Sequence, residues 1–64
     1  MKGLKNIRKL HHMTQNELAQ MVGITQAMVS HYETGRCNPD LETAARIANA
    51  LGCKVDDLIK EESA

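Results

Sequence analysis

A glycine between two short helical patterns is the feature that most limits how this chain can fold. Residues 14–36 read TQNELAQMVGITQAMVSHYETGR, with Gly23 in the middle. Thr14 and Glu17 have the spacing of a capping box, in which each side chain bonds the backbone N–H of the other residue, so a helix should begin directly after Thr14. Gly23 supplies the left-handed backbone conformation on which helices commonly end. A second helical pattern follows and stops at Gly35, so the stretch predicts a helix, a tight turn and a second helix.

The second helical pattern, residues 26–34, separates into two faces when successive residues are placed about 100° apart. One face would pack in a core and would carry Met28, Val29, Tyr32 and, at its edge, Glu33. The other face would carry small polar groups and a methyl group, from Gln26, Ala27, Ser30, His31 and Thr34. Amide, hydroxyl, imidazole and methyl groups can read the edges of DNA bases. From the residues alone, an ordinary solvated surface is an equally good interpretation of this face.

The rest of the chain predicts three further helices. Residues 2–12 form the first, with Leu4, Ile7 and His11 facing inward. Asp40 can cap a longer helix that ends before Gly52 and whose apolar stripe is Leu41, Ala44, Ala45, Ile47, Ala48 and Leu51. The last helix is short and carries Val55, Leu58 and Ile59, with Asp56 and Asp57 in its first turn.

The 64 residues allow one domain with one small core. We expect that core to span about residues 4–59, with the motif at 15–34 and a tail at 60–64. The chain has one Tyr and no Phe or Trp, so Leu, Ile, Val, Met and Ala must fill the core, which favours an all-helical fold. No apolar run approaches the roughly 18 residues of a membrane span, and the N-terminus does not resemble a signal peptide, so we expect a cytoplasmic protein with no membrane partner.

Charge is distributed unevenly although the formal net charge is zero. Residues 1–38 hold five basic and two acidic side chains, which gives +3, whereas residues 39–64 hold three basic and six acidic side chains, which gives −3. Contacts to phosphate supply most of the non-specific affinity for nucleic acid. The asymmetry therefore favours the N-terminal half as the side that would meet an anionic partner.

The same residues resemble the Cro and phage-repressor (XRE-like) helix-turn-helix family. Its signature is matched by Gln15, Leu18, Ala19, Gly23, Ile24, Thr25, Val29, Tyr32, Glu33, Gly35 and Pro39. The resemblance covers about 55 of the 64 residues without an insertion. It implies a compact five-helix, lambda-repressor-like all-α domain that regulates transcription, most often as a repressor. Its partner would be a palindromic double-stranded DNA operator, bound as a homodimer.

The resemblance, together with the two helical faces, assigns roles to particular residues. Base contacts are expected from Gln26, Ala27, Ser30 and His31. Phosphate contacts are implied for Gln15, Asn16, Thr25, Thr34, Arg36 and Asn38, and Gln15 would also buttress Gln26. Arg8 would form a structural ion pair with Glu33. We expect the dimer surface in the last part of the chain, at Leu51, Val55, Leu58 and Ile59.

Other chemistries have little support in the sequence. Cys37 and Cys53 lack the close spacing of zinc ligands, and His11 and His12 point about 100° apart on a helix, so we expect no metal. No catalytic constellation, phosphate-binding glycine loop, cofactor motif or small-molecule site is evident, so we do not expect an enzyme. Two other functions stay open: a DNA-binding antitoxin that also neutralises a protein toxin, and an adaptor that binds only proteins.

Overall fold

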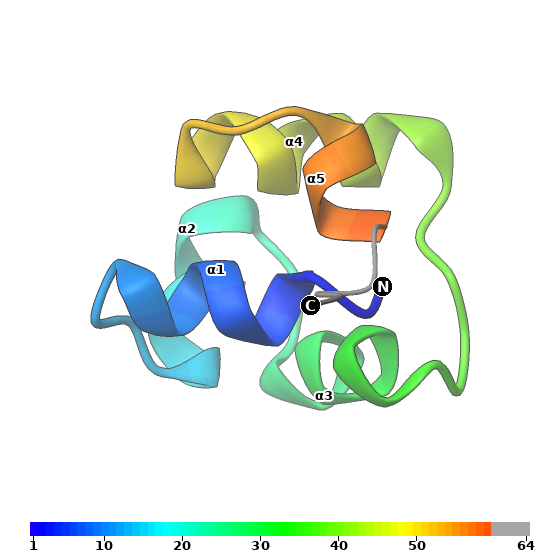
Figure 1. Ribbon diagram of the computed structural model, residues 1–64. Helices are drawn as coiled ribbons and strands as arrows, with labels where there is room; N and C mark the ends of the chain where they lie inside the picture. The colour runs from blue at the N-terminus through cyan, green and yellow to red at the C-terminus, as the bar shows by residue number, and fades with distance from the viewer. Residues whose placement is uncertain (60–64) are drawn as a thin grey trace.

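The computed structural model describes residues 1–59 and folds them into five α-helices. Their bounds are α1 Leu4–Leu10, α2 Gln15–Val22, α3 Gln26–Thr34, α4 Leu41–Leu51 and α5 Val55–Ile59. Figure 1 shows α4 and α5 on one side of the molecule and α3 on the opposite side. The prediction of an all-α fold with a helix-turn-helix is confirmed, whereas the expected tail at 60–64 lies outside the described residues. In the described part of the chain, no helix has the length and hydrophobicity needed to cross a bilayer.

The helix-turn-helix is formed by α2 and α3, and the local sequence fixes its ends. The backbone N–H of Glu17 donates to Thr14 Oγ1 at 3.0 Å, and that of Thr14 donates to Glu17 Oε1 at 2.8 Å, which is the expected capping box. Gly23 has φ +85°, a conformation that strains any residue with a Cβ atom. Thr25 Oγ1 then accepts from the Met28 N–H at 3.2 Å and starts α3. Capping of this kind stabilises a helix by about 1 kcal/mol.

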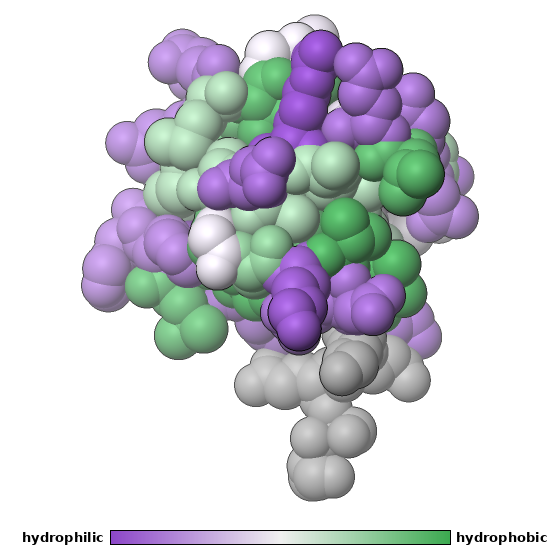
Figure 2. Space-filling view, turned by 90° about the horizontal axis from the view of Figure 1, so that it is seen from above, coloured by the Kyte–Doolittle hydropathy of each residue, from purple (hydrophilic) through white to green (hydrophobic). Residues whose placement is uncertain are grey.

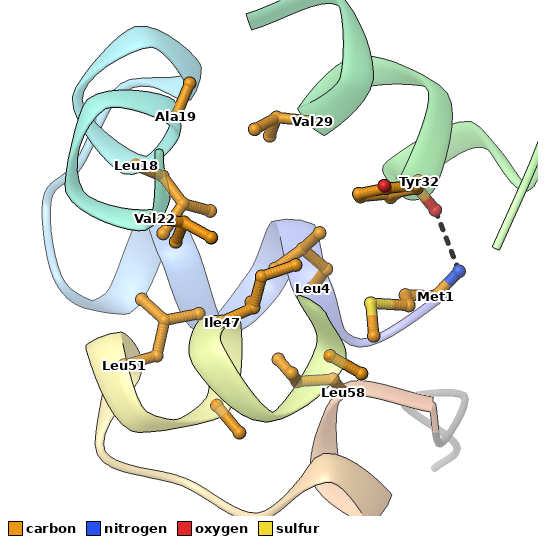
Figure 3. Packing of buried hydrophobic residues seen from close by; sticks show 12 residues of the cluster. Met1, Leu4, Leu18, Ala19, Val22, Val29, Tyr32, Ile47, Leu51 and Leu58 are labelled. Atoms are coloured by element: carbon orange, nitrogen blue, oxygen red, sulfur yellow. Dashed lines mark hydrogen bonds between the residues drawn. The ribbon is translucent and has the colours of Figure 1, made fainter. Parts of the chain in front are cut away.

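The core lies between the helices and receives side chains from all five of them. Figure 3 shows these side chains meeting, and the largest that are fully buried are Leu4, Leu18, Val29, Ile47, Leu51 and Leu58. Tyr32 extends the core towards the N-terminus, where the ammonium group of Met1 donates to its carbonyl oxygen at 2.8 Å. Burying one Leu or Val side chain contributes roughly 1.5–3 kcal/mol. This small set of apolar residues therefore holds α3 in place.

The first helix is shorter than the sequence predicted. It covers Leu4–Leu10 rather than residues 2–12, and its C-terminal end comes early because His12 has φ +57° and cannot continue the helix. The N–H of His12 donates to Lys9 O at 2.9 Å, and that of Met13 donates to Arg8 O at 3.2 Å, which is the Schellman pattern of helix ends. Glycine usually occupies this position, so a histidine there gives no indication in the sequence that the helix ends. His11, expected to face inward, is exposed.

The expected dimer surface was partly wrong, because the structure buries two of its four residues. Leu51 is 1% exposed and Leu58 is 0% exposed, so neither can contact a second chain. The Leu58 side chain packs in the core, and its carbonyl accepts from the Gly3 N–H at 2.8 Å, which holds α5 against the start of the chain. Leu41, expected in the buried stripe of α4, is instead 79% exposed, and Ile59 is 56% exposed.

Candidate nucleic-acid interface

The helix α3 presents one face to solvent and the other to the core, as its sequence indicates. Val29 and Tyr32 are buried, and Met28 packs partly against them. On the outer face Gln26 and Ala27 are exposed, while Ser30 and His31 are partly exposed. The helix itself lies on the side of the molecule opposite α4 and α5 (Figure 1). The predicted division of the helix is therefore confirmed, and the four residues expected to contact bases lie together at the surface.

The side chain of Gln26, the first residue of α3, is hydrogen-bonded to Gln15, the first residue of α2. Gln26 Nε2 donates to Gln15 Oε1 at 3.0 Å. Gln15 Nε2 in turn donates to Glu33 Oε1 at 2.9 Å. The amide of Gln26 is consequently tied to α2 at one end, while the rest of its hydrogen-bonding capacity faces outward.

A buried ion pair lies behind these two glutamines. Arg8 Nε and Glu33 Oε2 are 2.6 Å apart, and a second contact joins Arg8 Nη2 to Glu33 Oε1 at 3.4 Å. The two side chains are only 9% and 3% exposed. Arg8 Nη1 also donates to the carbonyl of Met13 at 2.6 Å. The expected pair is therefore present, and it connects α1, α3 and the loop that leads into α2.

The residues expected to contact phosphate are mostly exposed. Asn16, Thr25, Arg36 and Asn38 are accessible, and Gln15 is partly buried. The Thr25 hydroxyl oxygen accepts the cap hydrogen bond from Met28, so its proton is available to donate. The Thr34 hydroxyl instead donates to Ser30 O at 3.0 Å, so it must rotate before it can bond to a phosphate.

The charge distribution also fits an interface on the α3 side. Arg36, which directly follows α3, is exposed, as are Lys5 and Lys9 on α1, a helix that packs against both α3 and α5. The acidic residues Asp56 and Asp57 lie on α5, which is on the side opposite α3 (Figure 1). An anion that approaches α3 would therefore avoid the acidic half of the molecule.

An apolar groove beside α4 and α5 was not predicted from the sequence. It has a volume of about 560 Å³, and its lining includes Pro39, Leu41, Ala44, Val55 and Ile59. Figure 2, which looks onto the α4 and α5 side, shows apolar atoms over much of this face, bordered by hydrophilic residues. Val55 and Ile59 were expected at the surface from the sequence, but the periodicity of α4 placed Leu41 in the core, so the groove that these residues form together was not anticipated.

The structure offers no cluster of metal ligands among residues 1–59, where no three His, Cys, Asp or Glu side chains are grouped. Cys37 and Cys53 are both free thiols and partly buried. Burial raises the pKa of the Cys53 thiol, with a further contribution from the nearby charge of Asp57. Cys53 therefore stays protonated and unreactive near neutral pH.

Comparisons with known proteins agree with the helix-turn-helix formed by α2 and α3. A family model described as Helix-turn-helix matches residues 4–58. An HTH-type transcriptional regulator of Methanocaldococcus jannaschii is 36% identical over 55 residues, which are 86% of this chain and 83% of that protein. The immunity repressor protein of Bacillus phage phi105 is 35% identical over 60 residues, which are 94% of this chain but only 42% of the repressor.

A solved structure also shares the fold. The restriction-modification controller protein C.AhdI from Aeromonas hydrophila matches with a TM-score of 0.83 and 26% identity, over 89% of this chain and 86% of that one. The similarity therefore includes the arrangement of the helices as well as the motif residues.

The buried ion pair generates a stability prediction. Glu33→Ala should lower the free energy of unfolding by about 3–5 kcal/mol, because it leaves the Arg8 guanidinium buried without its counter-ion. Urea unfolding followed by circular dichroism measures this change.

The exposed pair on α4 is a matched control. Arg46 Nη2 and Glu42 Oε1 are 3.2 Å apart, but their side chains are 58% and 74% exposed. Glu42→Ala should therefore cost only about 0–1 kcal/mol. Equal unfolding midpoints for Glu33→Ala and Glu42→Ala would contradict a structural role for the buried pair.

Proposed function

Because the chain belongs to the Cro and phage-repressor (XRE) type of helix-turn-helix family, whose members are DNA-binding transcriptional regulators, we propose that it is a repressor that binds a two-fold symmetric operator as a homodimer. This role would place it in the cytoplasm, on DNA. The observation that carries the proposal is the outer face of α3, where Gln26 and Ala27 are exposed, Ser30 and His31 are partly exposed, and the Gln26 amide is hydrogen-bonded to Gln15.

We propose that α3 enters the major groove and that its outer face contacts base edges through Gln26, Ala27, Ser30 and His31. The groove admits an α-helix, and each base pair presents a distinct pattern of donors, acceptors and methyl groups there. The Gln26 amide can pair with adenine, and the Ala27 methyl group can pack on the methyl group of thymine. Ser30 and His31 can each form a hydrogen bond with either partner of a base pair.

Contacts to the DNA backbone would fix the position of α3 in the groove. In this proposal Gln15, Asn16, Thr25, Thr34, Arg36 and Asn38 contact phosphates on both sides of the helix. Their positions at the start of α2, at the two ends of α3 and in the loop after α3 support the assignment. Arg36 would contribute a charge-assisted contact and would make binding depend on salt.

The dimer would form through the apolar surface of Val55 and Ile59, joined by Leu41 in place of the buried Leu51 and Leu58. A single α3 helix reads only a few base pairs, whereas two copies related by symmetry read twice as many. The surface is small, so the dimer would be weak, with a dissociation constant on the order of micromolar. Its acidic surroundings, Asp56 and Asp57, would lie away from the phosphates.

Two substitutions separate base reading from backbone contacts. Gln26→Ala should cost about 1–3 kcal/mol on the preferred duplex and relax the choice of base at one position. Arg36→Ala should weaken binding to every duplex and reduce the slope of affinity against salt by about 1. Fluorescence anisotropy with labelled duplexes at several salt concentrations measures both effects.

Matched controls exist for both substitutions. Gln20 is an exposed glutamine of α2 outside the proposed contacts, and Arg46 is an exposed arginine of α4. Gln20→Ala and Arg46→Ala should leave affinity, base choice and salt slope unchanged. If Gln26→Ala changed only overall affinity, the outer face of α3 would not be the base-reading surface.

The dimer proposal predicts that Ile59→Lys gives a monomer without disturbing the core, because Ile59 is 56% exposed. Sedimentation should show a concentration-dependent monomer–dimer mixture for the parent chain and for Leu10→Lys, which changes an exposed apolar residue that does not line the groove. Ile59→Lys should also abolish cooperative filling of two half-sites. One chain per duplex at saturation for the parent would contradict the homodimer, and capture of a co-encoded small protein by this surface would favour the antitoxin instead.

A further inference from the structure

We propose that Glu33 determines which way round Gln26 presents its amide to a base, and that it does so through Gln15. In this account Glu33 is a positioning residue for base choice as well as a partner in the ion pair. The inference rests on the proposed function, in which Gln26 contacts a base edge. It follows from three hydrogen bonds that link a buried charge to the surface of α3.

The direction of the chain of hydrogen bonds is set at its buried end. An ionised carboxylate can only accept hydrogen bonds, because it carries no proton. Glu33 Oε2 lies 2.6 Å from Nε of the Arg8 guanidinium, and this ion pair holds the carboxylate in one orientation. Gln15 can therefore approach Glu33 Oε1 only with its amide nitrogen, at 2.9 Å. The reversed amide would place two acceptor oxygens against each other.

The orientation of the Gln15 amide fixes the orientation of the Gln26 amide. With the nitrogen of Gln15 directed at Glu33, its oxygen must be directed at Gln26, and an amide oxygen can only accept. Gln26 must therefore offer its own nitrogen to Gln15, at 3.0 Å. One N–H of Gln26 is used in this bond, so one N–H and the carbonyl oxygen are left for a partner outside the protein.

A fixed order of donor and acceptor matters for base choice. Adenine presents N7, an acceptor, beside its N6 amino group, a donor, whereas guanine presents two acceptors. A glutamine amide that can rotate freely presents its donor and acceptor in either order, so it discriminates less between bases. An amide that is held in one order matches adenine in one position and orientation and places like groups opposite the other bases. The buried charge thus acts on specificity without touching DNA.

The first test removes the link and leaves the ion pair in place. Gln15→Met keeps the length of the side chain but cannot bond to either neighbour. The readout is the ratio of dissociation constants for duplexes that differ only at the base pair read by Gln26. A bidentate amide contact gives a ratio of roughly 5-fold to 150-fold, and Gln15→Met should lower it by about fivefold or more. Asn38→Ala, which removes another proposed phosphate contact, should weaken all duplexes and preserve the ratio.

The second test changes Glu33 while Gln15 and Gln26 stay intact. The double substitution Arg8→Met with Glu33→Gln leaves no buried charge unpaired, and the new amide at position 33 can either donate to or accept from Gln15. The ratio should fall as far as it does in Gln15→Met. Should the double variant fail to fold, Glu33→Asp makes the same test, because it keeps a negative charge near Arg8 while the shorter side chain lengthens the hydrogen bond from Gln15.

The outcomes are distinct. If Gln26→Ala brings the ratio of dissociation constants to about 1 while the Glu33 variants keep the parental ratio, the role of Glu33 is overturned and base reading by Gln26 stands. If Gln26→Ala itself preserves the ratio, the proposed function of α3 fails and this inference fails with it. A lowered ratio in the Glu33 variants, with Asn38→Ala unchanged, supports the inference, because a purely structural role would alter affinity for all duplexes alike.

Discussion

The ion pair between Arg8 and Glu33 is the interaction on which the rest of the structure depends. It joins α1 to α3 by side chains that are almost fully buried, and Arg8 also holds the carbonyl at the end of the α1–α2 loop. A buried charge without its partner costs about 3–5 kcal/mol, which is comparable with the whole stability expected of so small a domain. The pair therefore fixes the position of α3 strongly, although a pair of apolar residues could stabilise the chain equally well. The presence of a charged pair, where an apolar pair would stabilise the chain as well, is explained if the charge also orients side chains at the surface of α3.

The outer face of α3 is available to a partner because its inner face is buried. A nine-residue helix is marginal on its own in water, so its shape comes from tertiary packing. Val29 and Tyr32 supply that packing, and the caps at Thr25 and Gly35 close both ends. Gly23 then places α2 so that Gln15 reaches Gln26. Local sequence, core and surface thus specify the same arrangement, and the family to which the chain belongs uses that arrangement to bind DNA.

Much of this arrangement could be predicted because its signals are local. The capping box at Thr14, the glycine ends and the two faces of α3 each depend on neighbouring residues, and all of them are present. The prediction failed where the answer depends on packing between distant segments. The periodicity of α4 and α5 identified apolar residues but not which elements cover them, so Leu51 and Leu58 were placed at the surface and Leu41 in the core. The early end of α1 was missed because His12 adopts a backbone conformation that usually requires glycine. The roles of the proposed DNA contacts depend on a partner outside the chain.

Selection of bound sequences from a pool of random duplexes tests the central claim most directly, namely that the outer face of α3 reads base sequence in two symmetric copies. It requires no knowledge of the operator and reports specificity and half-site spacing together. The account predicts an enriched, two-fold symmetric motif with half-sites about 34 Å apart, one turn of the DNA helix. A pool that stays random while retaining salt-dependent binding would show that the chain recognises only the DNA backbone, and an asymmetric motif would show that it binds without two-fold symmetry. Either result would contradict the account.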